Sequence, residues 1–419
     1  MLSRRSLLSA AGAGGVLSGT GPFAPSMHAA RTKSYSHSEL DWKIKRHDFS
    51  GVTKNDLPTP NLVLDKDVFD KNLRTLAGHC RKTGIGLRSH VKVHRSPEIG
   101  MLQIKSGAHG LCCATMAECE VMMNAGAPGI LWTSQPVGSN KLSRVVALTK
   151  RDPTFMFIVE NPITVDQLEE LAAAEKMTFN VVVDNDIGIN RRQGVKPGKE
   201  GLELSRRVMK AKNLKLAGLM GYSGAASHAK GWEHRRGVSH AKVDQLMESV
   251  HLCRKAGIPV DIVTGGSTGT YDIDSLHEDG LTELQAGSYA LMDSHYRTIG
   301  SKDGNETFDD FALALTVLTT AISRHDPKRA TIDAGKKSMT LPTDIVKDRP
   351  ELRVRPAGAE FGIIEWDETD HEPKLGDQLE LVMSNLDMSV NCFDRMFVCK
   401  GDQVVDVFSV MGRSGLSRA

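Results

Sequence analysis

The strongest constraint on the fold is an alternation of short apolar segments with amphipathic ones, repeated about eight times. The apolar segments are typical of buried strands and the amphipathic ones of helices. The segments interpreted as strands are 61–65, 87–95, 109–114, 129–133, 155–159, 179–184, 214–220, 260–264 and 283–287. Apolar strands alternating with helices indicate an α/β fold with a parallel sheet, and at this number of units a closed (β/α)8 barrel of the TIM type.

The rest of the chain predicts a second, smaller domain. From about residue 311 the alternation stops and short strands and hairpins follow, which predicts a C-terminal β domain over 311–419. We assign residues 58–310 to the barrel and 31–57 to a polar N-terminal segment. The alternative to a barrel is an open doubly wound sheet. That fold normally carries a glycine fingerprint at its first strand–helix turn, and this sequence has none there.

Residues 1–30 have the layout of an export signal. Arg4 and Arg5 precede a short run of apolar and small residues, and Ala29 and Ala30 supply small residues near a cleavage point. Adjacent arginines favour the twin-arginine route, so we expect a periplasmic protein, or a cytoplasmic one if the segment is an uncleaved tail. The run is too short for a membrane span, so no membrane partner is expected after signal removal. A net charge of +2 does not favour nucleic acid as a partner.

The segment 87–95 concentrates basic groups. If it is a strand throughout, Arg88, His90, Lys92 and His94 alternate with apolar or small residues and share one face. A lysine desolvated among cationic neighbours has a lowered pKa, which suits it to a Schiff base with an aldehyde. The alternative is an exposed edge strand with a solvated basic face.

Two successive segments late in the predicted barrel have the composition of phosphate-binding loops. Residues 263–270 end a strand in glycines and hydroxyls, and residues 285–289 follow the next strand with a similar composition. Glycines let backbone N–H groups approach an anion closely, and TIM barrels often bind phosphate with their last loops. Each loop taken alone is equally compatible with a tight turn.

Two more side chains follow strand ends. Arg191 lies just past 179–184 and is suited to a phenolate or carboxylate, and Tyr222 lies just past 214–220 and is suited to stacking on a ring. Taken alone, a solvated turn and ordinary packing explain them equally well. Together with Lys92 and the two phosphate loops, they indicate pyridoxal 5′-phosphate, with its aldehyde bonded to Lys92.

With these residues the sequence resembles the D-threonine aldolase / D-serine dehydratase family, the metal-activated branch of the alanine-racemase-like (fold type III) pyridoxal-phosphate enzymes. The resemblance covers residues 55–410 and is carried by Leu87-Arg88-x-His90-Val91-Lys92-x-His94, Gly110-x-Cys112-Cys113-Ala114, Tyr222-x-Gly224, Thr264-Gly265-Gly266-x-Thr268-Gly269-Thr270 and Glu283-Leu284-Gln285-x-Gly287-Ser288-Tyr289. It implies a Schiff base at Lys92, and a contact from Arg191 to the cofactor's phenolic oxygen. One extra residue precedes Gly194, so Arg192 is the alternative to Arg191. The cofactor-binding residues expected from the loops and the resemblance are Lys92, Arg191, Tyr222, Gly265, Gly266, Ser267, Thr268, Gly287, Ser288 and Tyr289.

The chain departs from this family at its metal pair. The resemblance places a histidine and an aspartate or cysteine where this sequence has Asn385 and Asp387. An amide oxygen with a carboxylate forms a hard oxygen site, which suits Mg²⁺ or Mn²⁺ better than Zn²⁺. The alternatives are a pair that holds no metal and a plain β-turn.

We therefore expect a lyase that acts on D-configured β-hydroxy amino acids, small-molecule substrates that it cleaves to glycine and an aldehyde. The catalytic residues would be Lys92 and His94, either of which is a candidate for the base that takes the hydroxyl proton. The aspartate at position 387 favours the aldolase over the alternative, a D-serine or D-3-hydroxyaspartate dehydratase. Metal-free racemisation and a non-catalytic pyridoxal-phosphate carrier are further alternatives. The resemblance also implies a homodimer.

Overall fold

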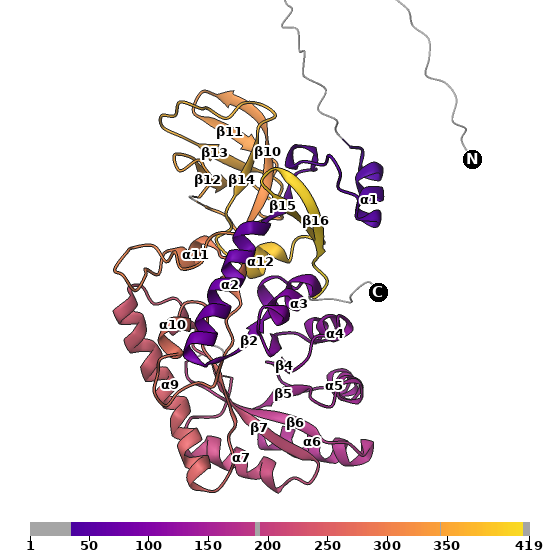
Figure 1. The fold of residues 1–419 in the computed structure, drawn as a ribbon, viewed down its shortest axis with the longest axis vertical. Helices are drawn as coiled ribbons and strands as arrows, with labels where there is room; N and C mark the ends of the chain where they lie inside the picture. Colours follow the sequence, from indigo (N-terminus) through magenta and orange to yellow (C-terminus); the bar gives the residue numbers. More distant parts are fainter. Residues whose placement is uncertain (1–34, 189–192, 344, 414–419) are drawn as a thin grey trace, which may run out of the picture.

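The structure, a computed structural model, describes residues 35–188, 193–343 and 345–413 of the 419-residue chain. It contains a closed barrel of eight parallel strands and a separate eight-stranded sheet, which lie at opposite ends of the molecule in Figure 1. The barrel strands are β2 (Gly86–His90), β3 (Gly110–Cys113), β4 (Ile130–Trp132), β5 (Met156–Val159), β6 (Phe179–Asn185), β7 (Leu214–Gly221), β8 (Ile262–Gly265) and β9 (Glu283–Leu284). The predicted barrel with a smaller C-terminal β domain is confirmed.

Helices cover the outside of the barrel. They are α2 (Lys66–Thr83), α3 (Pro97–Lys105), α4 (Met116–Asn124), α5 (Ser139–Arg151), α6 (Pro162–Glu175), α7 (Lys199–Lys210) and α9 (Trp232–Lys255), with the short helices α8 (Gly224–Ser227), α10 (Tyr271–Asp274) and α11 (Ser294–Arg297) in loops. Every residue of β3, β4 and β5 is buried, because one face fills the barrel and the other packs on helices. None of the helices in the described ranges is both long and apolar enough to cross a membrane.

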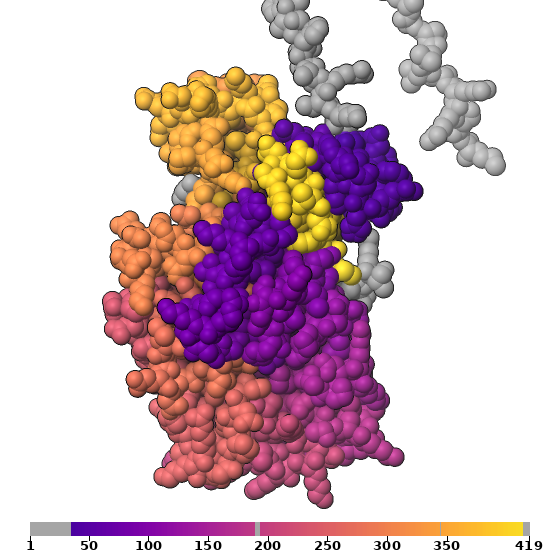
Figure 2. Space-filling view, in the orientation of Figure 1, coloured from indigo at the N-terminus to yellow at the C-terminus, as the bar shows by residue number. Residues whose placement is uncertain are grey.

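The second sheet is built from both ends of the chain. Its strands are β1 (Asn61–Asp65), β10 (Leu315–Asp326), β11 (Arg329–Ile332), β12 (Arg353–Pro356), β13 (Gly362–Glu365), β14 (Gln378–Leu381), β15 (Arg395–Lys400) and β16 (Gln403–Ser409). Helix α1 (His37–Arg46) precedes them, and Thr53 forms a β-bridge with Gln403. In Figure 2 the yellow C-terminal residues accordingly lie between indigo N-terminal ones.

Two sequence-based assignments were wrong. Segment 61–65, assigned to the barrel, instead forms β1, which pairs antiparallel with β10 and parallel with β15. Its fully buried centre fits any interior strand, so the apolar pattern does not say which sheet it joins. The second error concerns 87–95, because β2 ends at His90 and Val91–Val93 form a 3₁₀ turn, η2.

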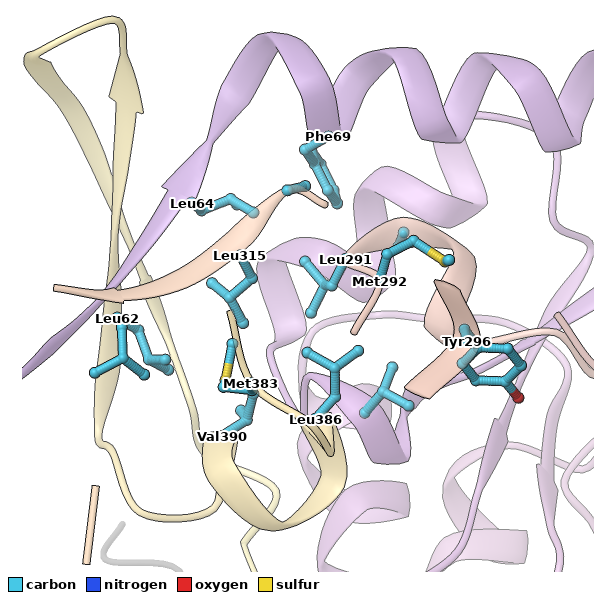
Figure 3. Packing of buried hydrophobic residues seen from close by; sticks show 14 of the residues in the cluster. Leu62, Leu64, Phe69, Leu291, Met292, Tyr296, Leu315, Met383, Leu386 and Val390 are labelled. Carbon is cyan, nitrogen blue, oxygen red and sulfur yellow. The ribbon is translucent and has the colours of Figure 1, made fainter. Parts of the chain in front are cut away.

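A shared hydrophobic cluster joins the sheet to the mouth of the barrel (Figure 3). Leu64 of β1 and Leu315 of β10 pack in it together with Leu291 from the loop after β9. Leu386 and Val390 belong to the same cluster and come from α12 (Leu386–Val390), a short helix after β14. The sheet domain therefore places α12 over the carboxyl ends of the barrel strands.

Candidate active site

A cavity of about 310 Å³ lies at the carboxyl ends of the barrel strands, where TIM barrels carry their chemistry. Its lining comes from α12 and from the carboxyl ends of seven barrel strands and the loops that follow them. The lining residues are His90, Lys92, Ala114, Thr133, Ser134, Asp184, Gln193, Met220, Tyr222, Ser267, Thr268, Gln285, Gly287, Ser288 and Asp387. A larger cavity of about 770 Å³ beside α11 contains none of the predicted site residues.

Lys92 and Asp387 face each other in this cavity. The Lys92 Nζ lies 3.1 Å from the Asp387 Oδ2, and each side chain is about one-third exposed. Lys92 is the middle residue of turn η2, and its backbone N–H donates to the Nδ1 of His90 over 3.4 Å. The sheet domain thus supplies a carboxylate to a lysine of the barrel.

Arg88 and Glu283 form a buried ion pair between the first and last strands of the barrel. Arg88 Nε and Nη2 donate to the two carboxylate oxygens over 2.7 and 2.9 Å, and His109 Nε2 lies 2.7 Å from Glu283 Oε2. Burial alone would raise the pKa of Glu283. Hydrogen bonds from His109 and Arg88 outweigh this effect and hold the pKa at about 2. Arg88 therefore helps to close the barrel and does not line the cavity.

His94 lies outside the cavity. The side chain is fully buried; its Nδ1 accepts from the N–H of Ser96 over 3.0 Å, and its Nε2 lies 3.2 Å from Gln103 Oε1. Burial lowers the pKa of His94 to about 3, so the ring is neutral and hydrogen-bonded at both nitrogens. The expected face of four basic groups was wrong, because the chain turns after His90 and side chains no longer alternate. The structure gives His94 no access to a substrate in this cavity.

The two predicted phosphate loops lie side by side. Ser267, Thr268, Gly287 and Ser288 line the cavity. The Thr268 hydroxyl accepts from the N–H of Tyr289 over 2.9 Å, which ties one loop to the other. Gly287 lets its loop pass close to the end of β2, since a Cβ there would lie 2.5 Å from the carbonyl oxygen of His90.

Three predicted cofactor residues do not line the cavity. Gly266 has φ +69° and Gly265 precedes it at the end of β8, so both shape the loop through backbone conformation. Tyr289 is buried against Phe311, with ring centroids 5.7 Å apart, and burial raises the pKa of its hydroxyl. These residues support the cavity wall from behind.

Tyr222 lines the cavity as expected, and its hydroxyl accepts from Ser227 Oγ over 3.4 Å. The prediction for Arg191, with Arg192 as its alternative, lies outside the described residues. Gln193, immediately after them, is described and lines the cavity.

Sequence reasoning missed His228, a half-buried side chain whose pKa is affected by both Lys92 and Asp387. Its ring stacks on His295, with centroids 4.3 Å apart and planes 3° from parallel. Burial, His295 and Lys92 together lower its pKa to about 4, against an opposing effect of Asp387. The Nδ1 is buried and has no hydrogen-bond partner among the described residues. The available signal was a histidine six positions after Tyr222, past a barrel strand end.

The residues at the expected metal pair do not fit a metal ion. Asn385 is the N-cap of α12: its Oδ1 accepts from the N–H of Met388 over 3.0 Å, and it does not line the cavity. Asp387 is then the single predicted ligand that faces the cavity. Within the described ranges, no group of three or more His, Cys, Asp or Glu side chains is arranged to hold a metal.

The packing of α12 fixes the position of Asp387. Leu386 and Val390 are buried in the cluster of Figure 3, and Arg95 Nη1 donates to the backbone oxygen of Asp387 over 2.8 Å. With one face of the helix anchored, Asp387 projects towards Lys92.

Comparison with protein families assigns most of the chain. Residues 64–295 match the family model of the alanine racemase N-terminal domain, and residues 314–399 match that of the serine dehydratase domain. A D-threonine aldolase of Arthrobacter sp is 32% identical over 362 residues, which cover 86% of this chain and 93% of that protein. A 3-hydroxy-D-aspartate aldolase of Paracoccus denitrificans is 29% identical over 368 residues, covering 87% of this chain and 94% of that protein.

A solved structure agrees with both the fold and the domain arrangement. The crystal structure of a D-threonine aldolase from Filomicrobium marinum superimposes with a TM-score of 0.81 at 30% sequence identity. The match covers 86% of this chain and 97% of that one, so it includes the barrel and the sheet domain.

Proposed function

The chain belongs to the D-threonine aldolase / D-serine dehydratase family of alanine-racemase-like pyridoxal-phosphate lyases, and we propose that it cleaves D-configured β-hydroxy amino acids to glycine and an aldehyde. The observation that carries this proposal is the position of the Lys92 amine, in one cavity with the two phosphate loops and 3.1 Å from Asp387. The aldolase is preferred because the three relatives compared above, which are 29–32% identical to this chain, are named as aldolases.

The cavity fits pyridoxal 5′-phosphate. Lys92 is placed to bond the aldehyde, and Ser267, Thr268 and Ser288 offer hydroxyls and loop N–H groups to the phosphate. Tyr222 lines the wall between these two ends and is suited to flank the ring. When bound, the cofactor supplies the electron sink for carbanion chemistry.

His228 is the residue that we propose as the proton acceptor for the substrate's β-hydroxyl. With a pKa of about 4 its imidazole is neutral at pH 7, so it can take a proton. Its unpartnered Nδ1 and its stacking on His295 support this assignment, together with the effects of Lys92 and Asp387 on its pKa. This assignment replaces His94, whose two ring nitrogens are already hydrogen-bonded in the core. Lys92 would hold the cofactor and, as an amine in the same cavity, would be suited to return a proton to the carbon left by cleavage.

The second candidate function is dehydration of a D-hydroxy amino acid. It is favoured by the match of residues 314–399 to a serine dehydratase domain. In that reaction Lys92 would remove the α proton and the β-hydroxyl would leave, giving a keto acid and ammonia. A non-catalytic carrier is disfavoured because the sheet domain places a carboxylate against the cofactor lysine.

Two further properties are proposed without a direct observation in the described structure. Twin-arginine export to the periplasm is supported by Arg4 and Arg5, and a homodimer by the resemblance to the family. Cell fractionation with and without Arg4→Lys/Arg5→Lys tests the first, and sedimentation equilibrium tests the second. If the double variant still reaches the periplasm, the twin-arginine proposal is wrong. If the protein is a monomer at micromolar concentration, the homodimer proposal is wrong.

D-Threonine distinguishes the candidate functions in one assay. The chain is loaded with the cofactor and incubated with D-threonine, and acetaldehyde, glycine and 2-oxobutanoate are quantified. The proposal predicts acetaldehyde and glycine in equal amounts, and neither product from L-threonine or from Lys92→Ala. Production of 2-oxobutanoate would assign the dehydratase instead. If D-threonine, D-serine and D-3-hydroxyaspartate all remain unchanged, the lyase proposal is wrong.

A further inference from the structure

We infer that this chain works without a tightly bound divalent metal ion, and that Asp387 meets the substrate's β-hydroxyl directly. The inference rests on the proposed function and concerns the same cavity. It is based on the oxygen atoms around α12 that could bind a metal. The family resemblance implies a metal pair at this position, but in the structure most of these oxygens accept backbone hydrogen bonds instead.

Asn385 is committed to the start of α12. An amide can bind a hard cation only through its oxygen, and this oxygen accepts the helix N–H of Met388. The backbone N–H of Asn385 donates to Thr340 Oγ1 over 2.9 Å, and Thr340 Oγ1 lies 3.1 Å from Ser389 Oγ. These contacts lie at the base of the helix, away from the cavity. Asn385 therefore has a structural role that explains its presence without a metal.

A carboxylate that contacts the start of α12 is also engaged. Burial raises the pKa of Asp293, with a smaller contribution from Asp387, and both Asp293 oxygens accept backbone hydrogen bonds. Its Oδ1 accepts from Tyr296 over 3.0 Å, and its Oδ2 accepts from Leu386 over 3.3 Å. Asp293 thus caps α11 and steadies the start of α12. A six-coordinate hard cation would gain one carboxylate from α12, that of Asp387, and this carboxylate is already paired with Lys92. Asn385, Asp293 and Asp387 therefore offer too few donors to hold such an ion in the absence of substrate.

Asp387 lines the cavity, and its side chain is about one-third exposed there. Its Oδ1 is buried, so the carboxylate oxygen that faces the cavity is Oδ2, which lies 3.1 Å from the Lys92 amine. A carboxylate oxygen in a cavity favours a hydroxyl donor, since leaving it unpaired is costly. The β-hydroxyl of the substrate supplies that donor. The hydroxyl has one proton, so this hydrogen bond would orient it in the bound substrate before that proton passes to His228 during cleavage.

The first test measures metal requirement on the cofactor-loaded chain. Protein treated with EDTA and passed over a desalting column is assayed for its metal content and for acetaldehyde release, and Mn²⁺ binding is titrated by calorimetry. The inference predicts metal far below one ion per chain, no measurable heat of Mn²⁺ binding and an unchanged rate. Stoichiometric Mn²⁺ binding, or activity that EDTA abolishes and Mn²⁺ restores, would overturn it.

The second test installs the missing ligand. Asn385→His is expected to gain Mn²⁺ binding that the original chain lacks, seen in the titration whether or not the variant turns over substrate. Met388→His is the matched control, because that side chain is 65% exposed on the outer face of α12 and should gain nothing. Equal Mn²⁺ binding by the original chain and Asn385→His would contradict the inference.

Asp387→Asn separates this inference from the proposed function. It should keep the cofactor absorbance band and lose acetaldehyde release by about a hundredfold or more, because the charged hydrogen-bond acceptor is gone. A rate within error of the original would reject the role of Asp387. If the original chain is inactive on every substrate, the proposed function fails, but the Mn²⁺ titrations still decide whether a metal is bound.

Discussion

Removing the negative charge of Glu283 should destabilise the barrel strongly. Glu283 lies on β9 and pairs with Arg88 on β2, so the ion pair bridges the two strands that close the barrel. Both side chains are about 95% buried. In Glu283→Gln the guanidinium of Arg88 would remain in the interior without its counter-charge, which is the costly way to break a buried pair.

The structure gives two routes to the size of this effect. Removing one partner of a buried pair typically costs about 3–5 kcal/mol. Independently, the difference between a pKa of about 2 and the ordinary 4.5 corresponds to about 3 kcal/mol of preferential stabilisation of the carboxylate. Glu120→Gln is the matched control. Glu120 forms an equally bidentate pair with Arg144, at 2.5 and 2.6 Å, but about one-third exposed, so its loss should cost less than about 1 kcal/mol.

Urea denaturation followed by far-ultraviolet circular dichroism measures both variants against the original chain. The pH dependence provides a second check. Because the folded pKa of Glu283 is depressed, its stabilisation is complete above pH 4.5 and is lost as the pH falls towards 2. The gap between the original chain and Glu283→Gln should therefore narrow between pH 5 and pH 3. Equal losses for Glu283→Gln and Glu120→Gln, or a gap that widens in acid, would refute the reasoning.

Two further perturbations address the site and a third addresses the stability of the fold. His228→Phe preserves a ring against His295 and should lower kcat by at least about a hundredfold while the cofactor absorbance band stays intact. In the original chain, kcat/KM should fall on the acid side near pH 4, because the His228 imidazole is neutral above that pH. A fall in kcat/KM near pH 6.5 would contradict this role. Thr268→Val removes the acceptor of the Tyr289 N–H and should weaken cofactor binding about tenfold in a fluorescence titration, whereas unchanged affinity would show that the link is dispensable. Arg235→Lys should lower the midpoint of thermal unfolding by several degrees. The fully buried guanidinium of Arg235 donates to four backbone oxygens of three loops, and a lysine ammonium cannot reach all four. An unchanged midpoint would show that these hydrogen bonds do not hold the loops together.

The barrel could be predicted because its signal is local and repeated. Each strand is apolar on both faces and each helix is apolar on one face, so every strand–helix unit independently predicts the same fold. The assignment of 61–65 failed because that segment has the same local pattern, and its partners β10 and β15 lie more than 250 residues away. Local periodicity carries no information about which distant strand a segment will pair with.

The site was predictable to the extent that residues follow strand ends directly. Tyr222 and Ser288 were found in this way, and they line one cavity with Lys92, which was proposed from the basic residues of segment 87–95. His94 was misplaced because the prediction extended strand alternation through a 3₁₀ turn. Asp387 could be proposed only from resemblance, since composition does not show that a helix of the other domain covers the barrel mouth.

The most direct test of the account is the identity of the lysine that holds the cofactor. The chain is loaded with pyridoxal 5′-phosphate, reduced with borohydride, digested and mapped by mass spectrometry. The account predicts one phosphopyridoxyl group, on the peptide that contains Lys92, and none on that peptide in Lys92→Ala. Modification of a different lysine as the dominant product, or no modification after loading, would contradict it.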